Sequence, residues 1–506
     1  MPTNGFVPNY INMNSSKTNK RELVFSFILP GLLIALPALL YIIFRAVNLS
    51  FTHDESLSFF IANGDTTYAQ TPNNHLVNTF LMRVFGGLFG NSEFALRLPN
   101  ILAFILYCLA GLTIIRNLKN PEISIILFAI LAINCLMFEF FGLARGYGLS
   151  MGMLMVSFYF FTKLNNQTLT IKVYMIFLVF TLLFSQLALY ANFNALNIHL
   201  AMIPALLFSI IQFAKRKINK QNKIAVIILF ISVFVVDLAA LIPAIARLKF
   251  MESINELAVF GDHKGLMQTT IKSLITSFYY HQQDFPVTFN IMLWGVVSVF
   301  VMGCLWFLRN LYFKDFNNFT LIFFVFCLYL LAPVLQEVIF KIPYPLTRTA
   351  ILYFPVFSLV FIFLFSELFS AAKNILLKAS LIVMLTGVST FVVYTAYVKR
   401  NFTNTSEWYY DKHDKEMLEL IAKDRFSCKN PDSVIISNHW TFTPVINFYR
   451  VTRNYVWLKP VIKEDYKKAD YYICYYDDVT KIPGDSIQLI AKYDDISVAL
   501  YKELKP

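Results

Sequence analysis

Long apolar stretches separated by polar connections run through most of the 506-residue chain. A helix needs about 20 consecutive apolar residues to cross the hydrocarbon of a bilayer. Eleven stretches approach or exceed this length, at approximately residues 24–46, 96–116, 122–141, 147–163, 172–191, 195–213, 224–246, 287–308, 319–340, 349–370 and 378–397. The pattern therefore predicts a membrane all-α protein with about 11 transmembrane helices, which form one module over residues 24–398.

Positively charged side chains are concentrated in alternate connections, and this predicts how the helices are oriented. Loops on the amino-terminal side hold 16 of them, namely Lys17, Lys20, Arg21, Arg116, Lys119, Lys163, Lys172, Lys215, Arg216, Lys217, Lys220, Lys223, Arg309, Lys314, Lys373 and Lys378. Such residues collect on the cytoplasmic side of multi-spanning proteins, so residues 1–23 are expected in the cytoplasm. An odd number of spans then puts the long connections at about 48–95 and 247–286, and the tail at 399–506, outside. A span count that differs by one would reverse the tail and leave the first outer loop in place.

The first outer loop contains a segment with helical spacing of apolar residues. Within residues 75–89, Leu76, Phe80, Val84 and Leu88 repeat at intervals of four. A helix with one such apolar face is expected to lie in the membrane interface. The same spacing fits a soluble helix packed on the loop, and both alternatives are open.

The tail changes from long apolar stretches to short alternating ones. Its pattern predicts helices at Lys415–Lys423 and Thr443–Tyr449, and strands at Ser433–Ser437, Tyr471–Cys474 and Ser497–Tyr501. These elements predict a small α/β domain over residues 399–506, outside the cytoplasm. Cys428 and Cys474 lie within it, and whether they form a disulfide is left open.

Composition narrows the class of protein. With 57% hydrophobic and 15% charged residues, the chain is too apolar for a set of soluble domains. Its net charge of +12 is carried largely by loops between apolar stretches, which favours a topological role and no nucleic-acid partner. No phosphate-binding loop of the GxxxxGKS/T or GxGxxG type occurs in the chain, so an ATP-driven pump is disfavoured.

Two adjacent acids, Asp54 and Glu55, follow the first predicted span directly. An ionised side chain at the bilayer centre costs roughly 2.5 to 3.5 kcal/mol on insertion scales, so acids at this boundary usually line a functional cavity. Asp54 is the leading candidate for a catalytic group. Glu55 is a candidate to orient an acceptor, to hold a metal or to share the role of Asp54. For each acid the structural alternative is a cap on the next helix.

A divalent metal ion is compatible with this part of the chain. Asp54, Glu55, His53 and His75 are all residue types that ligate metals. They show no fixed HxxxH or DxD spacing, so the sequence establishes no cofactor and leaves metal dependence open. An ordinary hydrogen-bonding role is the alternative for His75.

Four segments occur in an order that resembles a known superfamily. They are the acidic pair after the first span, Asn73–Thr79, Phe89–Pro99 and Ala144–Tyr147. Together they resemble the multi-spanning glycosyltransferases of the GT-C superfamily, in particular the protein mannosyltransferase and aminoarabinose lipid A transferase group and its bacterial relatives. The resemblance is densest over residues 48–162, extends loosely to about 370 and excludes the tail.

The resemblance implies a GT-C fold, a polyprenyl-phosphate sugar as donor, an extracytoplasmic active site and inversion at the anomeric carbon. It also implies that Asp54 activates the acceptor. Chemistry favours the same role, because a hydroxyl is a poor nucleophile at neutral pH and a carboxylate accepts its proton as general base. A lipid phosphate leaves readily where cations stabilise its charge.

Several other residues are candidate substrate-binding groups. The permanent charge and five donors of Arg145 suit a phosphate, although Glu139 is an alternative and purely structural partner. Arg348 is a second phosphate candidate, because it resembles the family's arginine before a late proline-bearing span. Tyr147 is expected to anchor at the interface rather than to stack on a sugar. Arg97 is expected to reach the interface rather than the substrate.

The chain also departs from the family pattern. Members often carry a His-Pro-Pro element where this chain reads Asn74-His75-Leu76, and the tyrosine that commonly follows the family's arginine is Thr349 here. No second matching acid can be placed in a later outer loop, and Glu139 is the best substitute. These departures weaken the assignment of the acceptor more than that of the superfamily.

The sequence therefore predicts a multi-pass protein of the bacterial inner membrane. It is expected to move a hexosyl or pentosyl group from a polyprenyl-phosphate sugar to an extracytoplasmic lipid, glycan or protein acceptor. The alternative is a transporter or flippase of an amphiphilic lipid-linked substrate, which should place charges and helix breaks near mid-membrane, often in related halves. The distinctive charges lie at one face and no internal repeat is visible, which favours the enzyme. An inactive scaffold is a third possibility, against which the acid pair argues.

Overall fold

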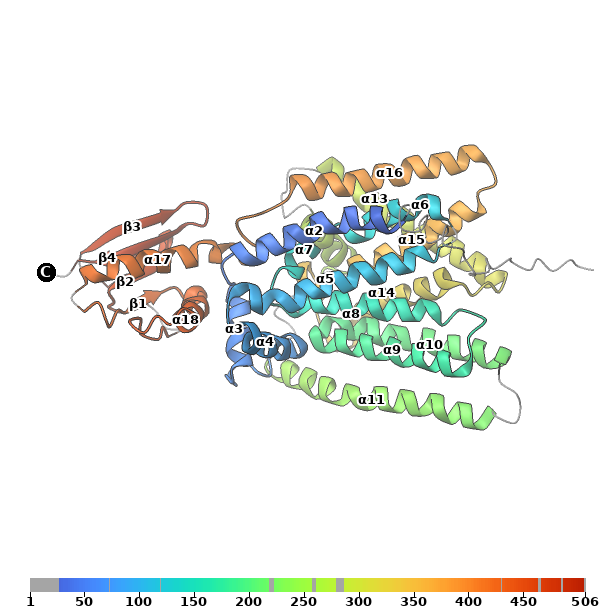
Figure 1. Ribbon diagram of the computed structural model, residues 1–506, viewed down its shortest axis with the longest axis horizontal. Coiled ribbons are helices and arrows are strands. Elements are labelled where there is room, and N and C mark those ends of the chain that lie inside the picture. Colours follow the sequence, from blue (N-terminus) through green and yellow to red (C-terminus); the bar gives the residue numbers. More distant parts are fainter. Residues whose placement is uncertain are drawn as a thin grey trace, which may run out of the picture.

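The computed structural model describes residues 27–71, 73–118, 120–217, 223–256, 261–278, 286–428, 430–462, 466–483 and 486–504 (Figure 1). The predicted cytoplasmic segment 1–23, with Lys17, Lys20 and Arg21, lies outside these residues. Long helices run side by side in one bundle, and a small domain with a sheet lies at one end of it (Figure 1).

Nine helices of the described part of the chain are long and apolar enough to cross a membrane. They are α2 (Leu29–Asn48), α5 (Glu93–Arg116), α9 (Ile171–Ala191), α10 (Leu196–Lys217), α11 (Lys223–Ser253), α13 (Pro286–Tyr312), α14 (Asn318–Phe340), α15 (Tyr353–Ala371) and α16 (Ile375–Val398). A tenth span results if α6 (Pro121–Ala132) and α7 (Cys135–Phe141) are counted together, although they meet at a bend of 62°. The prediction of a membrane all-α fold is confirmed, but the expected count of about 11 is higher than this.

With α6 and α7 counted as one span, a difference of one remains, and the fourth predicted span accounts for it. It forms the helix α8 (Gly146–Lys163), whose glycine and serine residues lower its mean hydropathy, so that it is not among the helices apolar enough to cross a membrane. Its glycines serve close packing, because a Cβ on Gly148 would lie 2.7 Å from the Phe140 carbonyl oxygen and one on Gly152 would lie 2.6 Å from the Ala103 carbonyl oxygen. The helix packs against both α5 and α9, so most of its surface is covered by protein.

Shorter helices form the two long connections, at about residues 48–95 and 247–286. They are α3 (His53–Ala62), α4 (Leu76–Phe89) and α12 (Lys272–Phe278). The predicted stripe of Leu76, Phe80, Val84 and Leu88 is exposed on α4. A helix that lies in the membrane interface must present such an apolar face to the lipid, so the exposed stripe agrees with that position for α4.

The tail forms the predicted α/β fold. Its elements are α17 (Asp414–Asp424), β1 (Ile436–Asn438), α18 (Thr443–Thr452), β2 (Tyr471–Tyr475), β3 (Ile487–Tyr493) and β4 (Val498–Glu503). The sheet order is β1-β2-β4-β3, with β1 parallel to β2 and the other two pairs antiparallel. The edge strand β3 was not predicted, since it is mostly solvent-accessible and mixes polar with apolar residues. Cys428 and Cys474 are both free thiols.

A shared apolar core docks the small domain on the first outer loop. The Phe51 and Phe448 rings stack with their centroids 4.0 Å apart, and the Phe51 N–H donates to the Tyr449 hydroxyl at 2.9 Å. Phe59 meets Phe448 edge to face. Full burial of one such side chain contributes roughly 1.5–3 kcal/mol. The domain is therefore held against the loop that carries Asp54.

Candidate active site

A capping box places the two acids in the first turn of α3. The Thr52 hydroxyl accepts from the Glu55 N–H at 3.4 Å, and Glu55 Oε2 accepts from the Thr52 N–H at 2.9 Å. Acids are stabilised there because the helix dipole is positive at its amino end. The capping role that the sequence left open for both acids is thus taken by Glu55.

Glu55 is also committed to a buried ion pair. Its two oxygens accept from Arg97 Nε at 2.8 Å and from Arg97 Nη2 at 2.7 Å. The Ala144 N–H donates to Glu55 at 2.6 Å, while Arg97 also donates to the carbonyls of residues 46, 49 and 50. Both side chains are completely buried. Arg97 therefore does not reach the interface, contrary to expectation, and the pair supports the loop from inside.

Arg97→Met is expected to cost about 3–5 kcal/mol of folding free energy, because it leaves the Glu55 carboxylate buried without its counterion. Thermal melting of the detergent-solubilised protein measures the loss. Lys492→Met is the matched control, since Lys492 pairs with Asp494 at 2.6 Å on the exposed surface and such pairs add little stability. Equal melting temperatures for the two variants would contradict a supporting role for the buried pair.

Asp54 lies between two arginine side chains from distant parts of the chain. Its Oδ2 is 3.1 Å from Arg145 Nη2 and 3.4 Å from Arg348 Nη1. Burial by itself raises the pKa of the Asp54 carboxyl, but the charges of Arg145 and Arg348 outweigh it and hold that pKa below its usual value. The Trp408 side chain donates a further hydrogen bond to this carboxylate. Asp54 is therefore an anion over the ordinary pH range.

Arg145 is the N-cap residue of α8, in the turn that follows α7. Its Nη1 donates to the Asp54 carbonyl at 3.1 Å, to the Ser58 hydroxyl at 3.0 Å and to the Asn73 carbonyl at 3.1 Å. Its Nε is buried without a hydrogen-bond partner. The guanidinium is thus positioned by α3 and the segment before α4, with donor capacity left over.

Glu139 does not pair with Arg145, and it lies outside the cavity described below. Its Oε2 is 3.2 Å from Arg45 Nη2, and its oxygens accept from the N–H and the hydroxyl of Ser406. The reason is the turn after Phe141, where α7 ends, which separates the two side chains. The structural alternative of an Arg145–Glu139 pair is therefore wrong, because Glu139 pairs with Arg45. The role of Glu139 as a substitute for the second acid stays a prediction.

Arg348 lies in the short helix η6 (Thr347–Ala350), directly before α15. Its Nη1 is 3.4 Å from Asp54 Oδ2 and 3.4 Å from Glu407 Oε2, and its guanidinium carbon lies 4.9 Å from the centroid of the Trp408 ring. Sequence reasoning did not find Glu407 or Trp408. They lie in the tail, which the family resemblance excludes, and their spacing carries no motif.

A cavity of about 370 Å³ opens on the side of the two arginines. Its walls come from several helices and connections and include Asn73, His75, Arg145, Tyr147, Lys249, Glu252, Tyr329 and Arg348. Neither Glu55 nor Arg97 contributes to it. The structure thus brings together His75, Arg145, Tyr147 and Arg348 around one space, with Asp54 immediately behind the arginines.

His75 and Tyr147 form one wall of this cavity. The two rings meet edge to face at 5.2 Å between centroids. The His75 nitrogens are buried and make no hydrogen bond of good geometry, although the Ala191 backbone lies close by. Burial, and then the charges of Arg145 and Arg247, hold the pKa of His75 well below its usual value, so the ring is neutral. Tyr147 is buried here and does not act as an interface anchor, contrary to expectation.

The predicted metal ligands do not gather. No group of three His, Cys, Asp or Glu side chains with the geometry for a metal occurs among the described residues. His53 turns toward the small domain, where its Nδ1 contacts the Thr441 carbonyl oxygen at 2.6 Å. Glu55 is engaged by Arg97, and His75 lies on the cavity wall.

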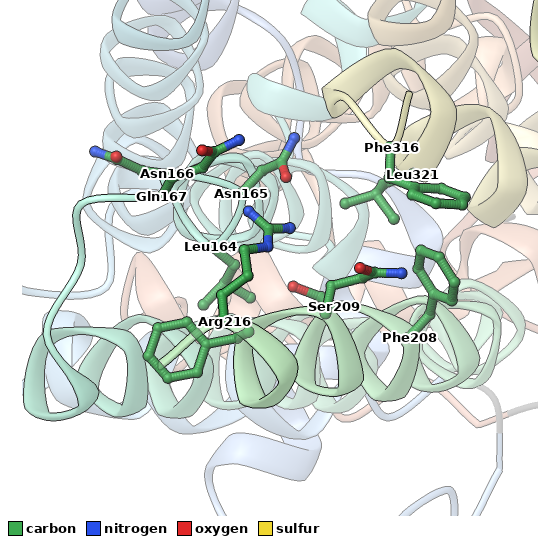
Figure 2. Close-up of a pocket in the computed structure, with 11 residues that line it drawn as sticks. Leu164, Asn165, Asn166, Gln167, Phe208, Ser209, Arg216, Phe316 and Leu321 are labelled. Carbon is green, nitrogen blue, oxygen red and sulfur yellow. The ribbon is translucent and has the colours of Figure 1, made fainter. Parts of the chain in front are cut away.

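A second, much smaller pocket lies between the turn that follows α8 and the carboxyl-terminal half of α10 (Figure 2). Its volume of about 20 Å³ is enclosed by residues that include Asn165, Ser209 and Arg216. Space of this size holds about one water molecule, so it does not compete with the larger cavity as a substrate site.

Another pair of acids, Asp411 and Asp414, is buried where the small domain meets α3. Asp411 Oδ2 accepts from the His53 N–H at 2.6 Å, and the two carboxyl groups face each other without another donor for Asp414. Burial, and for Asp411 also the charge of Asp414, raise the pKa of both carboxyls well above the usual value. In the unfolded protein these carboxyls have a pKa of about 4. Below that pH the pair makes its whole contribution to the free energy of unfolding, and this contribution is lost as the pH rises through the higher pKa of the folded protein.

Asp414→Asn is expected to raise the melting temperature more at pH 8 than at pH 5. At pH 8 the gain in the free energy of unfolding should be roughly 1–3 kcal/mol, because the amide removes a buried charge and keeps a hydrogen-bond donor. Melting curves at the two pH values measure it. Asp477→Asn, at an exposed position, controls for the substitution itself. An equal change at both pH values would contradict the raised pKa values of this pair.

Comparison with known proteins identifies the fold. No protein-family model matches the sequence, and no curated protein matches it. The structure resembles ArnT from Cupriavidus metallidurans in the apo state, with 9% sequence identity, a TM-score of 0.53, and coverage of 93% of this chain and 97% of that one. It also resembles ArnT from the same organism bound to undecaprenyl phosphate, with 10% identity, a TM-score of 0.50, and coverage of 94% and 97%. The fold expected from the GT-C resemblance is therefore confirmed.

Proposed function

We propose that this protein transfers a sugar from a polyprenyl-phosphate donor to an extracytoplasmic acceptor. The observation that carries the proposal is the pair of buried guanidiniums, Arg145 and Arg348, which contact Asp54 and also line a cavity of about 370 Å³. Two fixed cations next to one carboxylate suit a phosphate leaving group beside a general base. The fold shared with ArnT, whose structure has been solved with undecaprenyl phosphate bound, supports the same chemistry.

The reaction forms one bond and breaks one. The acceptor oxygen attacks the anomeric carbon of the sugar from the face opposite the phosphate, while its proton passes to the Asp54 carboxylate. The bond between the anomeric carbon and the phosphate oxygen breaks, and its electron pair leaves with the polyprenyl phosphate. Attack from the opposite face inverts the anomeric configuration.

Three side chains that line the cavity, Arg145, Arg348 and His75, act together with Asp54 in this scheme. Arg145 and Arg348 bind the donor phosphate and stabilise the charge that grows on its leaving oxygen. When the phosphate draws these guanidiniums away, Asp54 regains basicity, because their charges are what lowers its pKa. His75 is neutral, and its unused ring nitrogens suit the hydroxyl groups of the sugar.

The site is proposed to lie outside the cytoplasm. The helices α5 and α8 end at Arg116 and Lys163, at the end of the bundle away from Asp54 and the small domain. Basic residues at that end favour its cytoplasmic location. The active site and the α/β domain would then face the periplasm of a bacterial inner membrane.

The test is transfer by the purified protein. Wild-type protein is incubated with a panel of radiolabelled polyprenyl-phosphate hexoses and pentoses and with a membrane extract as acceptor. We expect label to move from one donor to an acceptor that no longer partitions with the donor lipid. Binding of donors with no transfer, together with movement of the intact donor across sealed vesicles, would contradict the enzyme and support the transporter or flippase.

A further inference from the structure

The segment that joins α16 to the α/β domain is anchored on the transmembrane bundle by hydrogen bonds. The Asn401 carbonyl accepts hydrogen bonds from the Arg45 guanidinium and from the Tyr41 hydroxyl. Glu139, which pairs with Arg45 at 3.2 Å, accepts from the N–H of Ser406. We call residues 401–408 the strap. A buried ion pair of the transmembrane bundle therefore fixes the strap just before it reaches the two residues that enter the site.

Glu407 follows these anchors directly and contacts Arg348, which lines the cavity. Its Oε2 is 3.4 Å from the Nη1 of Arg348, and that nitrogen is also 3.4 Å from Asp54 Oδ2. Both distances are longer than the 2.7–2.9 Å that is usual for a charge-assisted hydrogen bond. One guanidinium nitrogen thus lies between two carboxylates without a close bond to either. The Glu407 side chain is 19% exposed, against 10% for Asp54.

The charges of this cluster leave no place for a donor phosphate unless one anion moves. The ion-pair cluster at Asp54 holds two cations, Arg145 and Arg348, and two anions, Asp54 and Glu407. Elsewhere the cavity is lined by one more cation, Lys249, and two more anions, Glu252 and Glu256. A polyprenyl-phosphate sugar adds one negative charge to a buried site, where an uncompensated charge is costly. Asp54 is also held by Arg145 at 3.1 Å and by a hydrogen bond from Trp408, whereas the more exposed Glu407 pairs with Arg348.

We propose that Glu407 is an internal anion that occupies the place of the donor phosphate on Arg348 and is exchanged for it when the donor binds. This inference rests on the proposed function. Glu407 is a positioning residue in this scheme, since it acts through Arg348. After transfer, the polyprenyl phosphate carries a charge of about −1.5 to −2, as phosphate monoesters do at pH 7. The return of Glu407 to Arg348 then helps this product to leave.

Undecaprenyl phosphate is the probe that tests the exchange, because it carries the product phosphate without a sugar. Its affinity is measured on the full-length protein in nanodiscs for wild type, Glu407→Gln and Glu407→Asp. Glu407→Gln removes the competing charge and keeps the shape of the side chain, so we expect about tenfold tighter binding. Glu407→Asp keeps the charge and shortens its reach, so its affinity is expected to lie between the other two.

Two controls separate competition by charge from altered packing. Undecaprenol has the same chain without the phosphate, and its affinity is expected to be equal in wild type and Glu407→Gln. Glu419→Gln makes the same substitution at an acid that pairs with Arg453 in the small domain at 2.8 Å, and it is expected to bind undecaprenyl phosphate as wild type does. Melting curves establish that each variant is folded, and Glu407→Asp carries the test alone if Glu407→Gln does not fold.

The outcomes distinguish this inference from the proposed function. Unchanged or weaker binding by Glu407→Gln, with normal binding by wild type, would overturn the exchange and leave the function standing. Tighter binding of undecaprenol as well would also overturn it, since packing would then be the cause. A wild-type protein that binds no undecaprenyl phosphate would overturn both.

Discussion

Asp54→Asn is expected to lower the rate of sugar transfer by about a thousandfold, because general base catalysis contributes about 10²–10⁴ in rate. The amide keeps the size of the side chain and can accept the Trp408 hydrogen bond, but it cannot take the acceptor proton. The transfer assay with radiolabelled polyprenyl-phosphate sugar measures the rate. Undecaprenyl phosphate should still bind, since Arg145 and Arg348 remain in place.

The matched control is Asp477→Asn, because Asp477 is exposed on the small domain, away from the site. Melting curves establish that Asp54→Asn is folded. Transfer within about tenfold of wild type would lie below the range of general base catalysis and would assign the base role to another group.

The pH dependence of the wild type follows from the same surroundings. Burial raises the pKa of Asp54, but the charges of Arg145 and Arg348 lower it by more, so the net pKa is below the usual value and the anion persists below its usual titration range. The form active as base is therefore present above the lowered pKa and is lost only as pH falls through it. The acid limb of kcat/KM from Asp54 should lie below about pH 4, the reference value for an aspartate.

Arg145→Gln is expected to reduce transfer by about 10²–10³, the usual effect of removing one preorganised donor from a developing negative charge. Arg145 is buried, always charged and held toward Asp54 by three hydrogen bonds of its Nη1. Its loss removes one of two cations from the proposed phosphate site. Both the affinity for undecaprenyl phosphate and the transfer rate should therefore fall.

Two further variants interpret this result. Arg145→Lys keeps the charge without the planar set of donors, so its rate is expected to lie between those of wild type and Arg145→Gln. Arg116→Gln changes an exposed arginine at the other end of α5 and should leave the rate unaltered. Normal affinity for undecaprenyl phosphate in a folded Arg145→Gln protein would contradict the assignment of Arg145 to the donor site.

The general architecture was predictable because it depends on local properties of the chain. Apolar length alone located the helices, since burial in lipid is decided segment by segment. The exposed stripe on α4 followed from a spacing of four residues. The fourth stretch differed because the glycines and serines of α8 serve packing between helices, which hydrophobic length does not report.

The site was predictable only in part, because ion-pair partners are chosen by the tertiary fold. Asp54, Arg145 and Arg348 were all named from the sequence, yet their contact depends on three elements far apart in the chain. Glu55 was a candidate to share the role of Asp54, but its neighbour in space is Arg97 rather than the cavity. Proximity along the chain was misleading in the same way for Glu139, whose partner is Arg45.

Glu407 could not be identified as a site residue from the sequence alone. It pairs with Arg348 from the tail, outside the region of resemblance. One acid next to one tryptophan has no period or motif that marks it. Only the strap and its anchors on Arg45 and Glu139 bring it to Arg348.

The central claim is that the donor phosphate binds between Arg145 and Arg348 with Asp54 beside it. An experimental structure of the protein with a bound polyprenyl-phosphate sugar tests this most directly. We expect phosphate oxygens within about 2.7–3.2 Å of both guanidiniums, as hydrogen bonds require, with the anomeric carbon facing the side of Asp54. A phosphate bound elsewhere, with both arginines still paired to Asp54, would contradict it.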